Sequence, residues 1–174
     1  MSAPEVKVVA YDPKWPTLFE LERAVLEQAL APWLVGTIEH SGSTAVPGLS
    51  AKPVIDIMVP VRTLVGSEAA IGLLERKHDY HYWPYKSRVM HWLCKPGDRH
   101  RTHHLHLVPA GSPLFHERLA FRDALRADPD MQRRYTDLKH RLSEKHPDDR
   151  EAYTHGKAPF VAAELRRLRA PADR

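Results

Sequence analysis

Residues 53 to 61 form an apolar run that is interrupted by a single carboxylate, Asp56. A continuous apolar run of this length is typical of a strand buried on both faces of a sheet. Side chains alternate along a strand, so Ile55 and Ile57 point to one face and Asp56 to the other. An unpaired buried carboxylate is very costly, so Asp56 must find a hydrogen bond, an ion pair or a metal ion. We therefore take Asp56 as a candidate metal ligand or general base. The alternative is a structural role, in which Asp56 caps a neighbouring backbone or pairs with Lys52 or an arginine.

A turn of small residues, Gly42-Ser43-Thr44, precedes this run. The backbone N–H groups and hydroxyls of such a turn can cradle phosphate oxygens, although the spacing is not that of a Walker motif. Lys52 would offset phosphate charge or pair with the strand carboxylate. His40 is expected either to face the same cleft or to support the turn from behind. The plainer interpretation of the turn is that it only ends a strand.

Two histidines alternate with leucines in residues 103 to 108. On a strand, His104 and His106 share one face while the leucines share the other. Both imidazoles can then reach one ion or one phosphate. Beside Asp56, they would complete a metal site with open coordination positions. Taken alone, the pattern is equally typical of a solvent-exposed edge strand.

Basic residues outside these segments are candidates for the same cleft. Arg88 is expected at the start of a strand, from which it could bind phosphate. Lys139 follows Tyr135 by four residues, as Lys157 follows Tyr153, so each pair shares a helix face. An ordinary solvated helix surface is the default for both pairs. The alternative is that the helical half supplies cations and hydroxyls to a cleft shared with the sheet.

The pattern of elements predicts a single α+β domain over residues 1–174, with a small mixed sheet flanked by helices and a helical C-terminal portion. The sheet-containing core covers about residues 1–110, and the C-terminal helices cover about 111–170. Strands are expected at residues 6–9, 37–40, 53–61, 80–85, 88–94 and 103–108. Helices are expected at residues 12–32, 64–77, 113–126, 129–144 and 148–169, the last broken or kinked near Pro159.

The formal net charge of +4 favours anionic partners such as phosphorylated metabolites, without requiring nucleic acid. The single cysteine, Cys94, rules out an internal disulfide and fits a reducing cytoplasm. No apolar run is long enough to span a membrane and no signal peptide is recognisable, so we expect a cytoplasmic protein without a membrane partner. Signatures of serine hydrolases, zinc fingers and specific nucleic-acid binding domains are missing. The sequence predicts no oligomeric state.

Five segments that follow one another over nearly the whole chain carry a family resemblance: residues 11–16, 38–49, 52–57, 103–108 and 121–126. Together they resemble the GrpB family, and a similar domain is fused to dephospho-CoA kinase in actinobacteria. The family is placed in the nucleotidyltransferase superfamily. Enzymes of that superfamily have a Gly-Ser turn, then a strand with two carboxylates two residues apart, and a third carboxylate on a later strand. Those carboxylates hold two metal ions that activate a hydroxyl and neutralise the triphosphate.

Carried over by position, Gly42 and Ser43 match the turn. Asp56 matches the second carboxylate of the pair, and Val54 stands in place of the first. His104 or His106 stands where the third carboxylate would be. One aspartate with histidines supplies less negative charge and softer ligands than three carboxylates. Such a site suits Mn²⁺, Fe²⁺ or Zn²⁺ better than Mg²⁺.

The resemblance implies a nucleotidyltransferase-like protein that binds a nucleoside triphosphate or another phosphorylated small molecule with a divalent metal. If it is catalytic, it would transfer a nucleotidyl group to a small-molecule hydroxyl or amine. The implied roles are catalysis by Asp56, His106 and Lys52, metal binding by Asp56, His104 and His106, and phosphate binding by Gly42, Ser43, Thr44, Lys52 and Arg88. Two alternatives stay open. One is a non-catalytic ligand-binding or partner-assisting module, and the other is a single-metal phosphoester hydrolase with His104 or His106 as general base.

Overall fold

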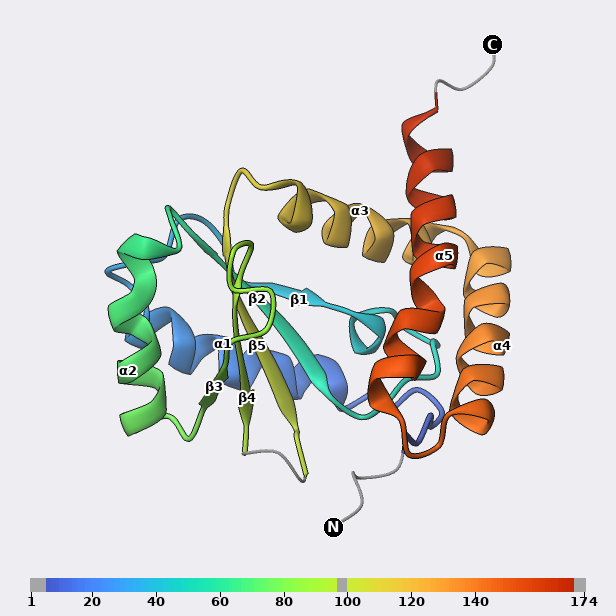
Figure 1. Cartoon of the computed structure of the whole chain (residues 1–174), viewed down its shortest axis with the longest axis horizontal. Coiled ribbons are helices and arrows are strands. Elements are labelled where there is room, and N and C mark those ends of the chain that lie inside the picture. The colour runs from blue at the N-terminus through green and yellow to red at the C-terminus, as the bar shows by residue number, and fades with distance from the viewer. Residues whose placement is uncertain (1–5, 97–99, 171–174) are drawn as a thin grey trace.

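The computed structural model describes residues 6–96 and 100–170. Over these residues it contains a mixed sheet with helices around it (Figure 1), so the predicted α+β class is confirmed. The strands are β1 (Glu39–Ser41), β2 (Ile55–Val61), β3 (His81–Trp83), β4 (His91–Lys95) and β5 (His103–Pro109). The α-helices are α1 (Trp15–Ala29), α2 (Glu68–Lys77), α3 (Pro113–Ala127), α4 (Pro129–Lys145) and α5 (Arg150–Arg169), and η1 (Ser43–Ala45) and η2 (Val65–Ser67) are short 3-10 turns.

The strand order β1-β2-β5-β4-β3 brings β2 and β5 together, although α2, β3 and β4 separate them in sequence. These two strands are parallel, and the other neighbouring pairs are antiparallel. The register of the parallel pair places Asp56 opposite His104 and Met58 opposite His106. Residues opposite each other on paired strands share a face of the sheet. The polar side chains of both strands therefore lie on the same side.

The two faces of the sheet are covered differently. Ile55, Ile57 and Val59 are fully buried on one face, in a core shared with apolar side chains of α1 and α2. On the opposite side, α3 contacts β1 and β5 and packs against α4 and α5. Figure 1 shows α4 and α5 at one end of the molecule, with α3 extending from them over the sheet. A second core of apolar residues joins these helices to the segment after η1, through Val46 and Leu49. The helical half is thereby held against the polar face of the sheet.

The three C-terminal helices begin close to where the sequence predicts them. Each has a polar N-cap that accepts a hydrogen bond from the backbone N–H three residues further on: Ser112 at 3.3 Å, Asp128 at 2.9 Å and Asp149 at 2.9 Å. Of the break or kink predicted near Pro159, the break is wrong, since α5 continues through this residue. Pro159 and His155, whose carbonyl loses its partner there, are both exposed, so water can satisfy that carbonyl. No helix within the described ranges has the length and hydrophobicity needed to cross a membrane.

Two predicted strands differ from the structure. The strand expected at residues 6–9 is reduced to one bridge between Val9 and Ala51. The strand expected at residues 88–94 begins only at His91, because residues 87–89 form a turn that follows Lys86 with its φ of 52°. The backbone N–H groups of Val89 and Met90 donate to the carbonyl of Lys86 at 2.9 and 3.2 Å and close this turn, so these residues cannot extend along a strand.

Candidate functional site

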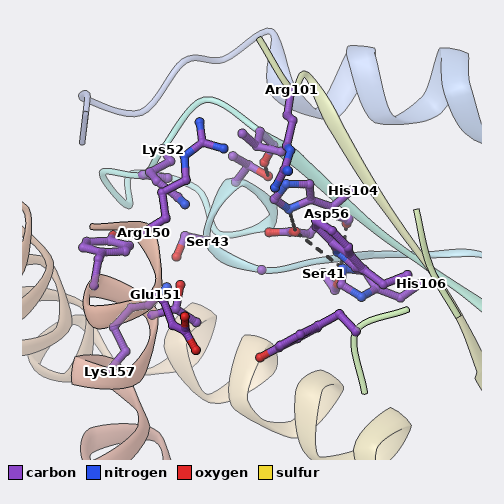
Figure 2. A pocket seen from close by; sticks show the side chains of 18 of the residues that line it. Ser41, Ser43, Lys52, Asp56, Arg101, His104, His106, Arg150, Glu151 and Lys157 are labelled. Atoms are coloured by element: carbon purple, nitrogen blue, oxygen red, sulfur yellow. Dashed lines mark hydrogen bonds and ion pairs between the residues drawn. The ribbon is translucent and has the colours of Figure 1, made fainter. Parts of the chain in front are cut away.

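A cavity of about 840 Å³ is formed where the polar face of the sheet meets the C-terminal helices. A cavity of this size is in the range of small-molecule sites. Figure 2 shows side chains from the turn after β1, from both central strands and from α5 around it. Seven residues predicted to act in catalysis, metal binding or phosphate binding line it: Gly42, Ser43, Thr44, Lys52, Asp56, His104 and His106.

Asp56 contacts both histidines of β5 (Figure 2). Its Oδ1 lies 3.0 Å from Nδ1 of His104 and 3.7 Å from Nε2 of His106. Burial favours a raised pKa for this carboxyl, but its contacts with the two imidazoles outweigh burial and hold the pKa well below its usual range. Burial, and secondly the charge of Arg118, lower the pKa of His106 to about 4. At neutral pH the site therefore holds an ionised carboxylate beside a neutral His106.

Gly42 brings the turn directly against this carboxylate. Its φ of 70° and ψ of −171° lie in a region that is essentially restricted to glycine. A Cβ at this position would overlap Oδ2 of Asp56 and lie 2.9 Å from its Cγ. The hydroxyl of Ser41 donates to the backbone carbonyl of Asp56 at 3.3 Å and so attaches the end of β1 to β2. The turn and the carboxylate are thus packed as one unit.

His40 and Thr44 support the turn from inside the protein. The Thr44 hydroxyl donates to the carbonyl of Val54 at 3.2 Å, so Nε2 of His40 is the donor in its 3.0 Å contact with Thr44 Oγ1. The His40 ring stacks on Phe19 with 4.6 Å between ring centres, and burial lowers its pKa to about 4. Of the two roles predicted for His40, the structure shows the supporting one. The Thr44 hydroxyl is likewise used within the fold, although the residue lines the cavity.

Basic side chains greatly outnumber acidic ones around the cavity. Among its described lining residues are eight lysines and arginines but two carboxylates, Asp56 and Glu151. The amino groups of Lys52 and Lys157 lie 5.2 Å and 4.5 Å from the centre of the Tyr153 ring. Burial, and secondly the charge of Lys52, lower the pKa of Lys157 to about 8. The depressed value reflects positive charges that are crowded together and poorly solvated, an arrangement that an anion would relieve.

Lys139 is almost completely buried at the edge of the cavity. Its amino group donates to the carbonyl of Ser50 and to the hydroxyl of Ser43 at 3.4 Å. Burial, and secondly the charge of Lys157, lower its pKa to about 7. A lysine from α4 is therefore anchored to the Gly-Ser turn, where its charge can be neutralised by a proton loss or by an anion.

Arg88 is not brought to this cavity. It is exposed on the turn before β4 and lies in a separate depression with Arg62 and His91. Its expected position at the start of a strand, pointing into the Asp56 cleft, is therefore wrong. Lys52 lines the cavity, but in the described structure the ion pairs of Asp56 are with the two histidines of β5.

Four residues that matter to the cavity were missed or given an ordinary role in the sequence. The helix faces of Lys139 and Lys157 are not simple solvated surfaces, and the alternative of a cleft shared between sheet and helices is the correct one. The sequence feature that indicated this alternative was the four-residue spacing of each lysine from a tyrosine. Arg118 of α3 and Arg101, just before β5, also line the cavity. Arg101 comes three residues before His104, at the start of the histidine segment, but was given no role. Arg118 stands in no motif, and only the fold reveals its position.

The donors around Asp56 suit a divalent metal chemically but do not form a ready-made centre. Within the described residues, no three His, Cys, Asp or Glu side chains are placed to hold an ion together. One carboxylate oxygen already accepts a hydrogen bond from His104. However, Nε2 of His106 is buried without a hydrogen-bond partner among the described residues, and Oδ2 of Asp56 faces Gly42. A metal here would need oxygens of a bound ligand to complete its coordination.

Comparisons with known proteins agree with this picture of the fold. The family model described as GrpB protein matches residues 5–167. A UPF0157 protein of Pseudomonas aeruginosa is 41% identical over an alignment of 166 positions that covers 93% of this chain and 67% of that protein. The crystal structure of conserved protein GrpB from Enterococcus faecalis matches with a TM-score of 0.82 and 33% identity, over 92% of this chain and 96% of that chain. A dephospho-CoA kinase of Mycolicibacterium paratuberculosis is 27% identical over an alignment of 195 positions that covers 93% of this chain and 46% of the kinase.

Proposed function

This chain belongs to the GrpB family, and we propose that its cavity binds a small molecule with several phosphate groups, such as a nucleoside triphosphate. The observation that carries the proposal is the excess of cations, eight lysines and arginines against two carboxylates, around a Gly-Ser turn. Like charges gathered in a cavity repel one another, and a polyanion removes that repulsion when it binds. The arrangement is therefore matched to a ligand of high negative charge.

The position of the phosphates follows from the residues that are still able to donate. Ser43 lines the cavity at the start of η1, and Lys139 reaches it from α4. Lys52 and Lys157 flank Tyr153 on the same wall. Arg118 contributes a further cation from α3. We place the phosphate chain between the Gly42-Ser43 turn and these side chains, where backbone N–H groups and cations act together.

A divalent metal enters this proposal together with the ligand. Asp56 and His106 would supply protein donors, and phosphate oxygens would supply the rest. The metal would neutralise part of the phosphate charge next to the Asp56 carboxylate, which otherwise repels an anion. Mn²⁺ is the first choice because the donors are one carboxylate and an imidazole.

Proton transfer at neutral pH has weaker support than binding. A general base works best when its pKa lies near the operating pH. His106, with a pKa of about 4, and Asp56, with a pKa well below its usual range, are both far from that value. We therefore propose ligand binding as the function of the cavity. Release of pyrophosphate from ATP in the presence of Mn²⁺ would add nucleotidyl transfer, and release of phosphate would add hydrolysis.

Lys157→Met is expected to weaken the binding of ATP about tenfold in isothermal titration calorimetry. The variant removes a cation that lies in the cavity wall, and a hydrogen bond to a charged group contributes about 1.5–3 kcal/mol. Arg88→Met is the matched control, because it removes one positive charge from an exposed position outside the cavity. Equal losses in the two variants, or no ATP binding by the unaltered protein, would contradict the proposal.

Asp56→Asn is expected to remove the strengthening of ATP binding by Mn²⁺ while leaving binding without metal intact or improved. The amide has the shape of the carboxylate but lacks its charge, so it is a poor metal ligand and does not repel phosphate. The measurement is calorimetric titration of ATP with and without Mn²⁺, and of Mn²⁺ alone. An undiminished effect of Mn²⁺ in the variant would exclude Asp56 as its ligand.

A further inference from the structure

Aromatic side chains from β3, β4 and the turn between them line one side of the same cavity. Trp83, Tyr85 and Trp92 all belong to its wall. Trp83 is 40% exposed and Tyr85 is 43% exposed. Large aromatic rings that remain this accessible beside a strongly cationic cavity are not needed to cover the core, whose cluster is formed by other residues. They are available to a ligand.

The register of the sheet connects these rings to the Asp56 cluster. Trp83 lies opposite Trp92 on the β3–β4 pair, and Trp92 lies opposite His106 on the β4–β5 pair. These side chains therefore share one face of the sheet and form a row that ends beside the carboxylate. The ring of Trp92 lies 5.2 Å from that of His104 and 6.2 Å from that of Tyr85, measured between ring centres. The row runs from the phosphate-binding region outward to the edge strand β3.

Arg101 lies between the aromatic side of the cavity and the side that contains Asp56. Its guanidinium lies 5.0 Å from the ring centre of Trp92 and 5.7 Å from that of Trp83. Its Nε is buried and has no hydrogen-bond partner within the described part of the chain. A buried donor without a partner is costly, and a polar atom of a ligand can satisfy it. Figure 2 shows this side chain pointing toward His104 and Asp56.

We propose that Trp83 and Tyr85, together with Arg101, form a stacking subsite for a planar ring of the ligand, and that this ring is a nucleobase. The inference rests on the proposed function, because the phosphates of the same molecule would occupy the Gly42-Ser43 turn. Stacking uses the face of a base, which every base has, so the subsite accepts purines and pyrimidines alike. Arg101 adds a donor and a cation at the junction between base and phosphates.

The test compares ATP, CTP and inorganic tripolyphosphate by isothermal titration calorimetry. Base stacking on an aromatic side chain is strong enough that both nucleotides should bind about tenfold or more tightly than tripolyphosphate. Trp83→Ala should weaken ATP binding about tenfold and leave tripolyphosphate binding unchanged. Trp83→Phe retains a ring and should restore most of the loss.

Tryptophan fluorescence provides an independent readout of contact. ATP should quench the unaltered protein, and Trp83→Phe should lose a large part of this quenching. Trp33→Phe is the control, because Trp33 packs on the core outside the cavity. Equal affinities for ATP and tripolyphosphate, or a Trp83→Ala variant that weakens both equally, would overturn the stacking subsite alone. Failure of both ATP and tripolyphosphate to bind would overturn the proposed function and this inference with it.

Discussion

Gly42→Ala is expected to lower the free energy of unfolding by about 3 kcal/mol or more. The backbone of Gly42 is in a region that costs other residues roughly 1–3 kcal/mol. The added methyl group would also overlap Oδ2 of Asp56 and come within 2.9 Å of Cγ, and such overpacking costs roughly another 1–3 kcal/mol. The carboxylate cannot move aside freely, because Oδ1 is held by His104. Urea denaturation followed by circular dichroism measures the change.

Gly111→Ala is the matched control for this substitution. Gly111 does not have a positive φ, and nothing lies within 4 Å of the place where its Cβ would stand. Its replacement should change the stability by less than about 0.5 kcal/mol. In an Asp56→Ala background, Gly42→Ala should cost less than in the unaltered protein, since the carboxylate that it would displace is gone. A Gly42→Ala variant as stable as Gly111→Ala would show that the turn does not lie against Asp56.

The contact of Asp56 with the two histidines was predictable because it depends on strand parity. A lone carboxylate in an apolar strand and an alternating His-Leu pattern each specify one polar face. When both strands join the same sheet in register, the two polar faces must coincide. The sequence did not show that β2 and β5 are direct neighbours, since they are separated by η2, α2, β3 and β4. That pairing is a property of the whole topology, and the family resemblance was the indication of it.

The cationic wall was harder to predict because it depends on how helices pack across the sheet. The four-residue spacing of Tyr135 and Lys139 defines a helix face but not what that face meets. The angle at which α4 packs decides whether Lys139 is solvated or buried beside Ser43. That angle is set by the apolar residues around Tyr135 and Phe160.

The predicted position of Arg88 was wrong for a local reason. The β-forming residues of 88–94 favoured a strand, but the chain turns just after Lys86, which has a positive φ.

The lowered pKa values of Lys139, which is buried, and Lys157, which is partly buried, have opposite consequences for stability and for ligand binding. In the ligand-free protein, Lys139 has a pKa of about 7 and Lys157 of about 8, whereas lysines of an unfolded chain titrate near 10.4. Between these values the unfolded state holds more protons, so the free energy of unfolding rises with pH. For each lysine, the free energy of unfolding rises by up to about 1.4 kcal/mol per pH unit. The lowered pKa values of His40 and His106 change the free energy of unfolding only below about pH 6.5, so they do not affect this range.

The affinity for a polyphosphate is expected to fall steeply over the same range, by roughly 20-fold between pH 7.5 and 9.5 from Lys157 alone. Above its pKa of about 8, the lysine is neutral in the free protein and must take up a proton when the anion binds. Lys139 loses its proton above about pH 7 and so also lowers the affinity as the pH rises. The pKa of Lys52 is also lowered by burial, which adds to the effect. Calorimetry with ATP, whose adenine ring and phosphate groups keep a nearly constant charge between pH 7.5 and 9.5, should therefore show tighter binding at pH 7.5 and net proton uptake at higher pH.

Lysine replacements separate this mechanism from a general effect of pH on a basic protein. Lys157→Met should flatten both dependences, so that affinity falls less and stability rises less between pH 7.5 and 9.5. Lys145→Met removes an exposed lysine at the end of α4 and should leave both slopes unchanged. The prediction is specific because stability rises with pH while affinity falls. A protein that simply loses structure at high pH would lose stability and affinity together. An affinity that stays constant up to pH 9.5 would mean that these lysines do not face the anion, and the phosphate chain would then have to be placed elsewhere in the cavity.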